Sequence, residues 1–347
     1  MEKIIMEHGS GGRATGELIR TIFEDAFSNP VLSQMEDAAV IPGGAQIAMT
    51  TDSFVVTPLE FPGGDIGRLC VCGTVNDLLM RGATPKYMTC GFILEEGAEV
   101  ALLKRLVQSM AQTAREAGVM VVAGDTKVIE GNGGIYINTT GVGIVPTDID
   151  IKAANAKVGD KILVSGTMGD HHATILSSRM NIQNKIVSDN APLNEMVLQL
   201  LEQEIKVHVL RDVTRGGLGT VLKELAQSSH CEFEVEQDLI PVSATVKDFC
   251  GLLGLDPLYM GNEGKLVAIV DPEDEAKALE IIRLARYGKD AVTIGTVTAE
   301  HPTGNVLLKT HIGGRRSIDI LQEKDCRASV NYDFGMTFHN SSSTSSL

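Results

Sequence analysis

The chain has 347 residues, 43% of them hydrophobic and 22% charged, which is typical of a globular protein long enough for two ordinary domains. Its 30 Lys and Arg against 45 Asp and Glu give a net charge of −15. This balance argues against a general nucleic-acid binder, because such binders neutralise phosphates with basic side chains. No stretch stays apolar for the roughly 18 residues of a membrane span, and the N-terminus lacks a signal-peptide core. We therefore expect a cytoplasmic protein.

In the first half of the chain, apolar residues at helical spacing alternate with short apolar runs that are typical of strands. We predict helices over residues 16–27, 65–80 and 100–117, and strands over residues 47–56, 87–94, 119–123 and 135–145. Asp65 is placed to cap the second of these helices. The second half shows the same alternation of helical and strand patterns. Its predicted strands lie over 161–166, 266–270, 291–297 and 306–308, and its predicted helices over 192–203, 218–227 and 274–286.

The composition turns polar between residues 146 and 159, so we place a domain boundary near residue 150. This gives an N-terminal α/β domain over 1–150 and a C-terminal α/β domain over 151–320. Residues 321–347 lose apolar periodicity and end in a serine-rich run, so we expect a disordered, atypical tail.

Four aspartates stand where apolar runs meet small residues: Asp37, Asp52, Asp77 and Asp125. Any one of them alone would more often be a turn or capping residue. Their shared setting favours a metal site, because Mg²⁺ binds one or two carboxylates together with water and phosphate oxygens. The sequence therefore indicates Mg²⁺ and a polyphosphate such as ATP.

A glycine-rich segment, Gly9, Ser10, Gly11 and Gly12, precedes the first predicted helix. Its N–H groups suit an anion at a helix start, although a plain N-terminal loop would look the same. With Ala14 the segment also fits the dinucleotide pattern G-x-G-x-x-A, but the preceding apolar run has only three residues, which disfavours that fold. No Walker A motif is found, so an ATP site must be of another design.

Four further residues are candidates, each with an ordinary alternative. Lys127 suits a phosphate but equally the surface, and Glu263 suits a general base, an ammonium-binding group or a turn. Asp212 lies in residues 211–217, which fit either a second anion site or a salt-bridged turn before a helix. His171 lies at a strand-to-helix turn and is weak evidence for catalysis.

The six cysteines are scattered and form no CxxC pair, so neither zinc nor a disulfide framework is indicated. Most suit the core as small apolar residues. Cys326 differs because it stands in a polar segment where thiol chemistry is available.

Several long motifs occur in one order between residues 8 and 319. They are HGSGG at 8–12, TTDSF at 50–54, FPGGDIG at 61–67, CGTVND at 72–77, CGFILEEG at 90–97, GDTK at 124–127, RDVTRGG at 211–217 and NEGK at 262–265. Through them the chain resembles the HypE family of hydrogenase maturation proteins, in the superfamily of aminoimidazole ribonucleotide synthetase and selenophosphate synthetase.

The resemblance implies a two-domain α/β fold whose N-terminal domains form a shared barrel in a homodimer, with ATP and Mg²⁺ in the cleft between domains. It implies ATP-dependent dehydration of a carbamoyl group, carried as a thioester on a C-terminal cysteine, to a thiocyanate that supplies cyanide to [NiFe] hydrogenase. The implied partners are the carbamoyltransferase HypF and the HypC–HypD complex.

On this assignment each candidate residue takes a role. The implied metal ligands are Asp37, Asp52, Asp77 and Asp125; the implied ATP-binding residues are Gly9, Ser10, Gly11, Gly12, Asn76, Lys127 and Asp212. Glu263 becomes the base that takes the amide proton, because a phosphorylated amide oxygen can leave once that proton is removed.

One departure concerns the end of the chain. Members of the family end in a Pro-Arg-Ile-Cys-like tail, whereas this chain ends Ser345, Ser346, Leu347. Either the tail has been replaced or Cys326 has become the acceptor thiol. We favour replacement and expect this form to bind ATP without completing the cyanide pathway. Two other hypotheses stay open: a related kinase or synthetase acting on a different amide or selenide, and a docking subunit without catalysis.

Overall fold

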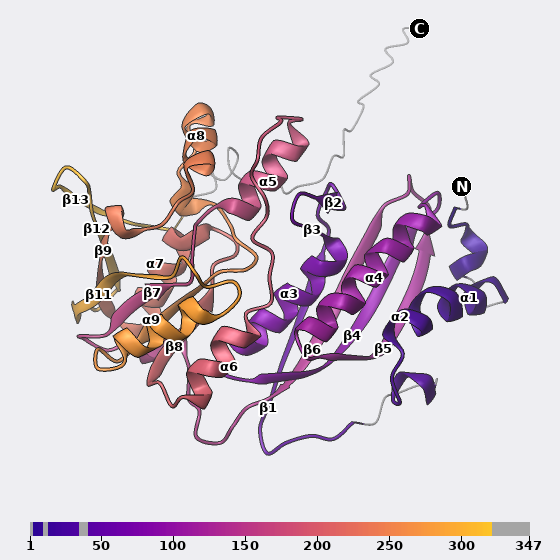
Figure 1. The fold of residues 1–347 in the computed structure, drawn as a ribbon, viewed down its shortest axis with the longest axis horizontal. Coiled ribbons are helices and arrows are strands. Elements are labelled where there is room, and N and C mark those ends of the chain that lie inside the picture. The colour runs from indigo at the N-terminus through magenta and orange to yellow at the C-terminus, as the bar shows by residue number, and fades with distance from the viewer. Residues whose placement is uncertain (1–2, 10–12, 35–40, 321–347) are drawn as a thin grey trace, which may run out of the picture.

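The structure is a computed structural model that describes residues 3–9, 13–34 and 41–320 (Figure 1). Its strands fall into two main sheets, one from each half of the chain, and no described strand crosses residue 150. The first sheet has the order β1-β6-β4-β5. Its strands are β1 (Ile47–Phe54), β4 (Thr84–Glu95), β5 (Met120–Ile129) and β6 (Ile135–Ile144). A small hairpin, β2 (Glu60–Phe61) and β3 (Gly64–Asp65), precedes the first long helix.

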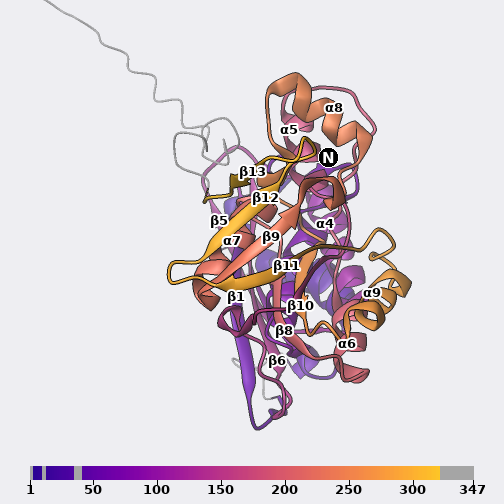
Figure 2. The same ribbon diagram turned by 90° about the vertical axis from the view of Figure 1, so that its left-hand side faces the viewer.

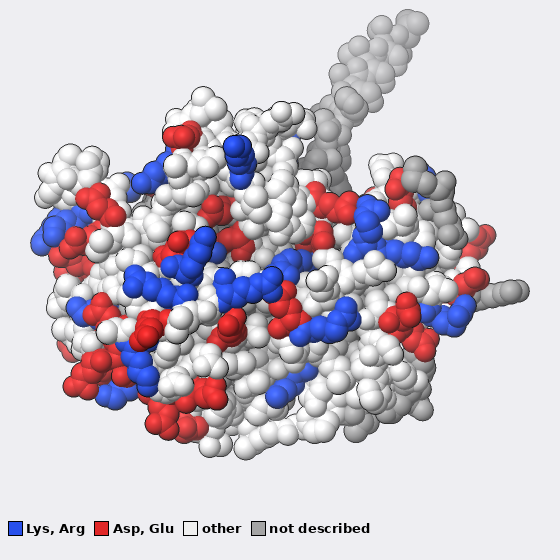
Figure 3. All heavy atoms as spheres, viewed as in Figure 1, with Lys and Arg blue, Asp and Glu red and all other residues white. Residues whose placement is uncertain are grey.

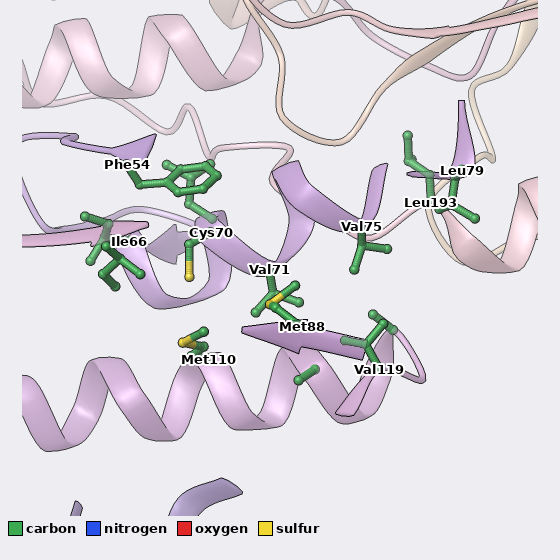
Figure 4. Close-up of a cluster of buried hydrophobic side chains, with 14 of the residues drawn as sticks. Phe54, Ile66, Cys70, Val71, Val75, Leu79, Met88, Met110, Val119 and Leu193 are labelled. Carbon is green, nitrogen blue, oxygen red and sulfur yellow. The ribbon is translucent and has the colours of Figure 1, made fainter. Parts of the chain in front are cut away.

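Two helices, α3 (Ile66–Leu79) and α4 (Val100–Glu116), cover one face of this sheet (Figure 1). Asp65 caps α3 as expected, since its side chain accepts a hydrogen bond from the N–H of Arg68 at 2.9 Å. The helix α3 is buried on almost all sides because it lies between the sheet, α4 and the C-terminal half. Figure 4 shows Val71 of α3 next to Met88 of β4, and Met110 of α4 below Cys70 of α3.

The opposite face of the first sheet is open. Along β1 the side chains alternate, and the exposed ones include Ile47 and Met49, of which Met49 is 64% exposed. Ile93 of β4 and Ile129 of β5 are also exposed apolar residues. Apolar side chains thus lie uncovered on strands of this sheet within a single chain.

The C-terminal half holds a seven-stranded sheet in the order β13-β12-β9-β11-β7-β10-β8, whose strands are spread from β13 and β12 down to β10 and β8 in Figure 2. Its strands are β7 (Lys161–Val164), β8 (Val207–Asp212), β9 (Cys231–Glu236), β10 (Leu266–Val270), β11 (Val292–Glu300), β12 (Asn305–Lys309) and β13 (Arg315–Ser317). Its helices are α5 (Asp170–Arg179), α6 (Asn194–Glu202), α7 (Gly217–Ser229), α8 (Ala244–Leu253) and α9 (Glu275–Leu284). The strand β10 is buried throughout because it lies between β7 and β8 and its alternate side chains enter a hydrophobic core on each face of the sheet.

The predicted mixed α/β fold is confirmed, with three local corrections. The predicted strand over 119–123 continues to Ile129, so Asp125 lies inside β5 rather than after it. The first helical run begins at Arg13 and is divided into α1 (Arg13–Leu18), a π-helical segment (Ile19–Glu24) and α2 (Asp25–Phe27). The strands β8 and β9 and the helix α8 were not among the predicted elements.

Among the described residues, no helix is both long and apolar enough to cross a membrane. The five described cysteines are all buried and free, as expected of small core residues. Figure 3 shows basic and acidic side chains interspersed over the face that it presents.

Candidate active site

Three of the predicted acidic residues and Glu263 come together where the two halves of the chain meet. Asp52 is on β1, Asp77 is in the last turn of α3, and Asp212 ends β8. The helix α3 brings Asp77 to this place because it packs on β1 and also contacts β8. Glu263 precedes β10, the strand that pairs with β8.

Local contacts hold two of these carboxylates. The hydroxyl of Thr50 donates to Oδ2 of Asp77 at 2.8 Å, and the N–H of Ser53 donates to Oδ1 of Asp52 at 2.8 Å. Asp52 lies close against α3, since its Oδ2 is 3.7 Å from where a Cβ on Gly73 would stand. A Cβ at that position would meet the ring of Phe54 at 2.9 Å, so the ring, and not the acid, favours glycine there.

The electrostatics of the group indicate mutual repulsion. Burial raises the pKa of Asp77, and the charge of Asp52 raises it further. Burial, with the charges of Asp77 and Asp52, raises the pKa of Asp212 to about 7. Burial also raises the pKa of Glu263 well above its usual range, and Asp212 is the largest of the carboxylates that add to this rise. Clustered carboxylates of this kind favour a bound cation.

A cavity of about 400 Å³ opens beside these acids, between β1, α3 and β8. Asp77 and Asp212 line it together with the basic residues Arg81, Lys152 and Arg211. Its size is that of a small-molecule site. The acidic residues of the cavity suit a cation, and the basic residues suit phosphate groups. The cavity is therefore chemically suited to a polyphosphate with its metal ion.

A fully formed metal cage is absent. Within residues 3–9, 13–34 and 41–320, no three His, Cys, Asp or Glu side chains converge closely enough to hold an ion by themselves. The donor set still fits Mg²⁺, which uses one or two carboxylates and takes its other ligands from water and phosphate.

The structure does not bring Asp125 to this group within one chain. In the first sheet, Asp125 lies in one row of paired residues with Gly91, Asn138 and Ser53. Asp52 pairs with Thr139, which follows Asn138 in β6 and therefore belongs to the neighbouring row. Thr139 is buried and contacts Thr74 of α3, with 2.5 Å between hydroxyl oxygens. Because side chains alternate between faces, Asp125 points to the open face.

On that face Asp125 is engaged by Lys127. Nζ of Lys127 lies 2.6 Å from Oδ2 of Asp125, and both side chains are about two-thirds exposed, at 64% and 66%. The hydrogen bond from Lys127 lowers the pKa of Asp125. In a single chain, therefore, neither residue reaches the cavity beside Asp77.

Asn76 also differs from its predicted role in ATP binding. It is only 3% exposed, and its amide is used by backbone groups. Nδ2 donates to the carbonyl oxygen of Ala191 at 3.1 Å and to that of Glu263 at 3.5 Å, and Oδ1 accepts from the N–H of Leu193 at 2.9 Å. A buried amide with these partners holds protein backbone and is not free for a nucleotide.

His171 is placed in the core between the halves. It is 1% exposed, Nδ1 lies 2.8 Å from the hydroxyl of Ser188, and the ring packs edge-on against Phe61 with centroids 5.5 Å apart. Burial lowers the pKa of His171 to about 3, and the charge of His172 contributes. These contacts place His171 in the interior, and its weak catalytic assignment stays a prediction.

The remaining predicted residues lie at or beyond the edge of what is described. Gly9 ends a short 3-10 helix, Met6–Gly9. Ser10, Gly11, Gly12, Asp37 and Cys326 lie outside the described residues, as does the tail. Their roles stay predictions.

Two functional candidates were missed by the sequence analysis. Asp189 is buried, accepts a hydrogen bond from the N–H of Glu263 at 3.1 Å, and lies 3.7 Å from Nζ of Lys265. The signal for Lys265 was its place in the motif NEGK. Asp189 stands in a polar run before Pro192, which resembles any loop.

Comparisons with known proteins identify the folds of both halves. Residues 35–145 match the family "AIR synthase related protein, N-terminal domain", and residues 157–306 match "AIR synthase related protein, C-terminal domain".

Close relatives agree. The carbamoyl dehydratase HypE of Cupriavidus necator is 50% identical over 325 residues, which are 92% of this chain and 92% of that protein. A crystal structure of hydrogenase maturation protein HypE in complex with ATP is 44% identical, with a TM-score of 0.89 over 92% of this chain and 98% of that one. A HypE–HypF complex structure is 45% identical, with a TM-score of 0.76 over 89% and 100% of the two chains.

Proposed function

The chain belongs to the HypE family of AIR synthase-related proteins, and from this membership we propose that it is an ATP-dependent carbamoyl dehydratase of [NiFe] hydrogenase maturation. The observation that carries the proposal is the cavity at the junction of the two halves, lined by Asp77, Asp212 and three basic residues, in a chain that matches an ATP-bound HypE structure over 92% of its length. The substrate is a carbamoyl group held as a thioester on a protein cysteine, and the product is the thiocyanate.

The chemistry proceeds in two steps. The carbamoyl oxygen attacks the terminal phosphorus of ATP, so that a new O–P bond forms while the bond to the departing ADP breaks. Loss of one amide proton accompanies this step. Expulsion of phosphate, with loss of the second amide proton, then leaves the carbon–nitrogen triple bond. An amide oxygen is a poor leaving group, and its phosphorylation is what makes dehydration feasible at neutral pH.

The residues of this chain take the following parts. Glu263 accepts the amide proton; burial, with the charges of Asp212 and Asp189, raises its pKa, which makes its carboxylate a stronger base. Asp52 and Asp77, with Asp212 from the second half, would hold Mg²⁺, which supplies charge neutralisation at the phosphates when bound. The basic residues Arg81 and Lys152, which also line the cavity, would attract the polyphosphate.

Asp125 and Lys127 require a second copy of the chain. They lie on the open face of the first sheet, where apolar residues such as Met49 are also exposed. We propose that two copies pair through this face as a homodimer, which covers the apolar residues and brings Asp125 and Lys127 into a shared interior. Under this proposal their predicted roles in metal and phosphate binding belong to the dimer, together with those of Asp37 and the loop Gly9–Gly12.

The proposed partners follow from relatives. A HypE has been captured with HypF, and we propose that HypF, the carbamoyltransferase, loads this chain in the cytoplasm. We further propose the HypC–HypD complex as the receiver of the cyanide group.

The test is mass spectrometry of the purified chain with HypF, carbamoyl phosphate, ATP and Mg²⁺. With a Pro-Arg-Ile-Cys ending added to supply the acceptor thiol that the family resemblance implies, the proposal predicts ATP consumption and, on the carbamoylated cysteine, loss of the mass of one water; the chain without this ending should bind ATP only. Asp77→Asn should abolish this loss because it removes a carboxylate beside the cavity. Failure of the wild-type chain to bind ATP would overturn the proposal, and carbamoylation of Cys326 would overturn the expectation that this cysteine is not the acceptor.

A further inference from the structure

Residues 188–193 form a buried segment that joins the two halves of the chain, here called the interdomain segment. On the N-terminal side, the N–H of Ser188 donates to the carbonyl oxygen of Pro62 at 2.9 Å. Nε of Arg68 donates to the carbonyl oxygen of Asn190 at 3.0 Å. Ser188 and Asn190 are 8% and 4% exposed, so the segment is part of the interior.

On the C-terminal side, the interdomain segment holds the peptide of Glu263. The N–H of Glu263 donates to Oδ1 of Asp189 at 3.1 Å, and its carbonyl oxygen accepts from the N–H of Ala191 at 3.4 Å. The approach is so close that a Cβ on Gly264 would lie 1.9 Å from the carbonyl oxygen of Asp189. Only glycine allows this contact without a shift of the backbone.

Asn76 closes the arrangement from the first half. Its Nδ2 reaches the carbonyl oxygens of both Ala191 and Glu263, and its Oδ1 accepts from the N–H of Leu193. It directly precedes Asp77, which lines the cavity. One side chain therefore links the helix that carries the metal-binding candidate to the peptide that carries the base.

The carboxylate of Asp189, which accepts the hydrogen bond from the Glu263 N–H, is stabilised by the charge of Lys265. Oδ2 of Asp189 receives no hydrogen bond in the described part of the chain and lies 3.7 Å from Nζ of Lys265. Both side chains are nearly buried, at 4% and 10% exposure. Lys265 also donates to the carbonyl oxygen of Gly264 at 3.3 Å. The pair offsets two buried charges while leaving Oδ1 of Asp189 directed at Glu263.

We propose that Asp189 and Asn76 are positioning residues for the reaction: they fix the peptide of Glu263 so that its carboxylate meets the substrate at the cavity. This inference rests on the proposed function, because it takes Glu263 as the base of the dehydration. Neither residue touches the substrate. Their contribution is the placement of the base relative to Asp77, and small errors of placement are costly in a reaction that depends on alignment.

The decisive experiment compares two charge-neutral double variants. Asp189→Asn with Lys265→Met keeps an acceptor oxygen for the Glu263 N–H, whereas Asp189→Leu with Lys265→Met removes it. Replacing a buried ion pair by apolar side chains of similar size is often neutral or stabilising, so both variants are expected to fold. The Asn variant should keep kcat within about threefold of wild type, and the Leu variant should lower kcat roughly 10- to 100-fold.

Substrate binding separates positioning from general damage. The KM for ATP and the calorimetric Kd for MgATP should stay within about threefold of wild type in both double variants and in Asn76→Ala, which should also lose kcat. Tyr287→Phe is the matched control, since it removes the hydrogen bonds of Tyr287 with Arg68 and Glu116, which also join the halves, without touching Glu263. It should leave kcat unchanged.

Equal kcat in the two double variants would overturn the inference. All kcat values are measured on chains that carry the added Pro-Arg-Ile-Cys ending. If the otherwise wild-type chain with this ending shows no dehydration, the proposed function fails instead, and hydrogen exchange at the Glu263 amide then decides the inference alone. That amide should be protected in wild type and in the Asn variant and exchange faster in the Leu variant. The same protection in both variants would refute the role of Asp189.

Discussion

The buried imidazole of His171 should make the stability of the protein fall between neutral and mildly acidic pH. Burial lowers the pKa of His171 to about 3, whereas an unfolded histidine titrates at 6.5. Between these values the unfolded chain binds more protons than the folded chain, so the stabilising effect is complete above pH 6.5 and is lost as pH falls toward 3. Linkage gives a loss of about 2 kcal/mol between pH 7.5 and pH 5.0, on the way to roughly 5 kcal/mol in full.

The assay is urea unfolding of wild type and His171→Gln at both pH values. Glutamine keeps a polar contact to Ser188 but loses the ring contact with Phe61, so the variant is less stable at pH 7.5. Because glutamine does not titrate, the difference should shrink by about 2 kcal/mol at pH 5.0. His301→Gln, in a surface turn, is the control and should show the same difference at both values. An unchanged difference for His171→Gln would refute the buried neutral imidazole, and complete loss of kcat at pH 7.5 would support its predicted catalytic role.

Three further predictions concern separate parts of the molecule. Gly264→Ala should lower the free energy of unfolding in urea by at least about 2 kcal/mol, because its Cβ would meet the carbonyl oxygen of Asp189 at 1.9 Å. The control is Gly251→Ala in α8, which has open space around it and should be neutral or stabilising. Equal effects of the two substitutions would contradict the close approach at Gly264. Met49→Lys should convert dimer to monomer in analytical ultracentrifugation, since Met49 is on the open sheet face; an unchanged mass would exclude this face as the interface. Binding of Mg²⁺ with ATP should release about half a proton at pH 7, because the pKa of Asp212 is about 7; calorimetry in buffers of different ionisation enthalpy measures this, and an equal release in Asp212→Asn would assign the proton elsewhere.

Most of the fold was predictable because its elements carry strong local signals. The strand β10 agrees with its predicted bounds, and the helix α4 with its predicted start. The strand β9 was missed although its buried side chains alternate at Cys231, Phe233 and Val235, a pattern typical of a strand. The strand β8 ends inside the motif at 211–217. The two glycines of this motif indicate a loop, so the sequence pattern did not mark the preceding residues as a strand.

The site was predictable in composition but not in all its geometry. Asp52, Asp77, Asp212 and Glu263 were predicted and do converge, because the end of α3 meets β8. The face of the sheet on which Asp125 lies could not be predicted, because the predicted strand ended at Ala123 whereas β5 continues to Ile129. Successive side chains of a strand point to opposite faces, so the face of a residue follows only once the residue is known to belong to the strand. The role of Asn76 was out of reach, since its partners Ala191, Leu193 and Glu263 are 115 to 187 residues away in sequence.

The buried pair of Asp189 and Lys265 tests whether this part of the chain is built for stability or for catalysis. The two charges are 3.7 Å apart, and Oδ2 of Asp189 receives no hydrogen bond from the residues that the structure describes. The attraction between them therefore offsets little of the cost of removing both from water. We therefore expect Asp189→Leu with Lys265→Met to unfold at a urea concentration no lower than wild type while its kcat falls. Such a result is the known exchange of activity for stability at functional sites. A variant that loses stability and kcat together would instead show that the pair supports the fold, and that its contact with Glu263 is incidental.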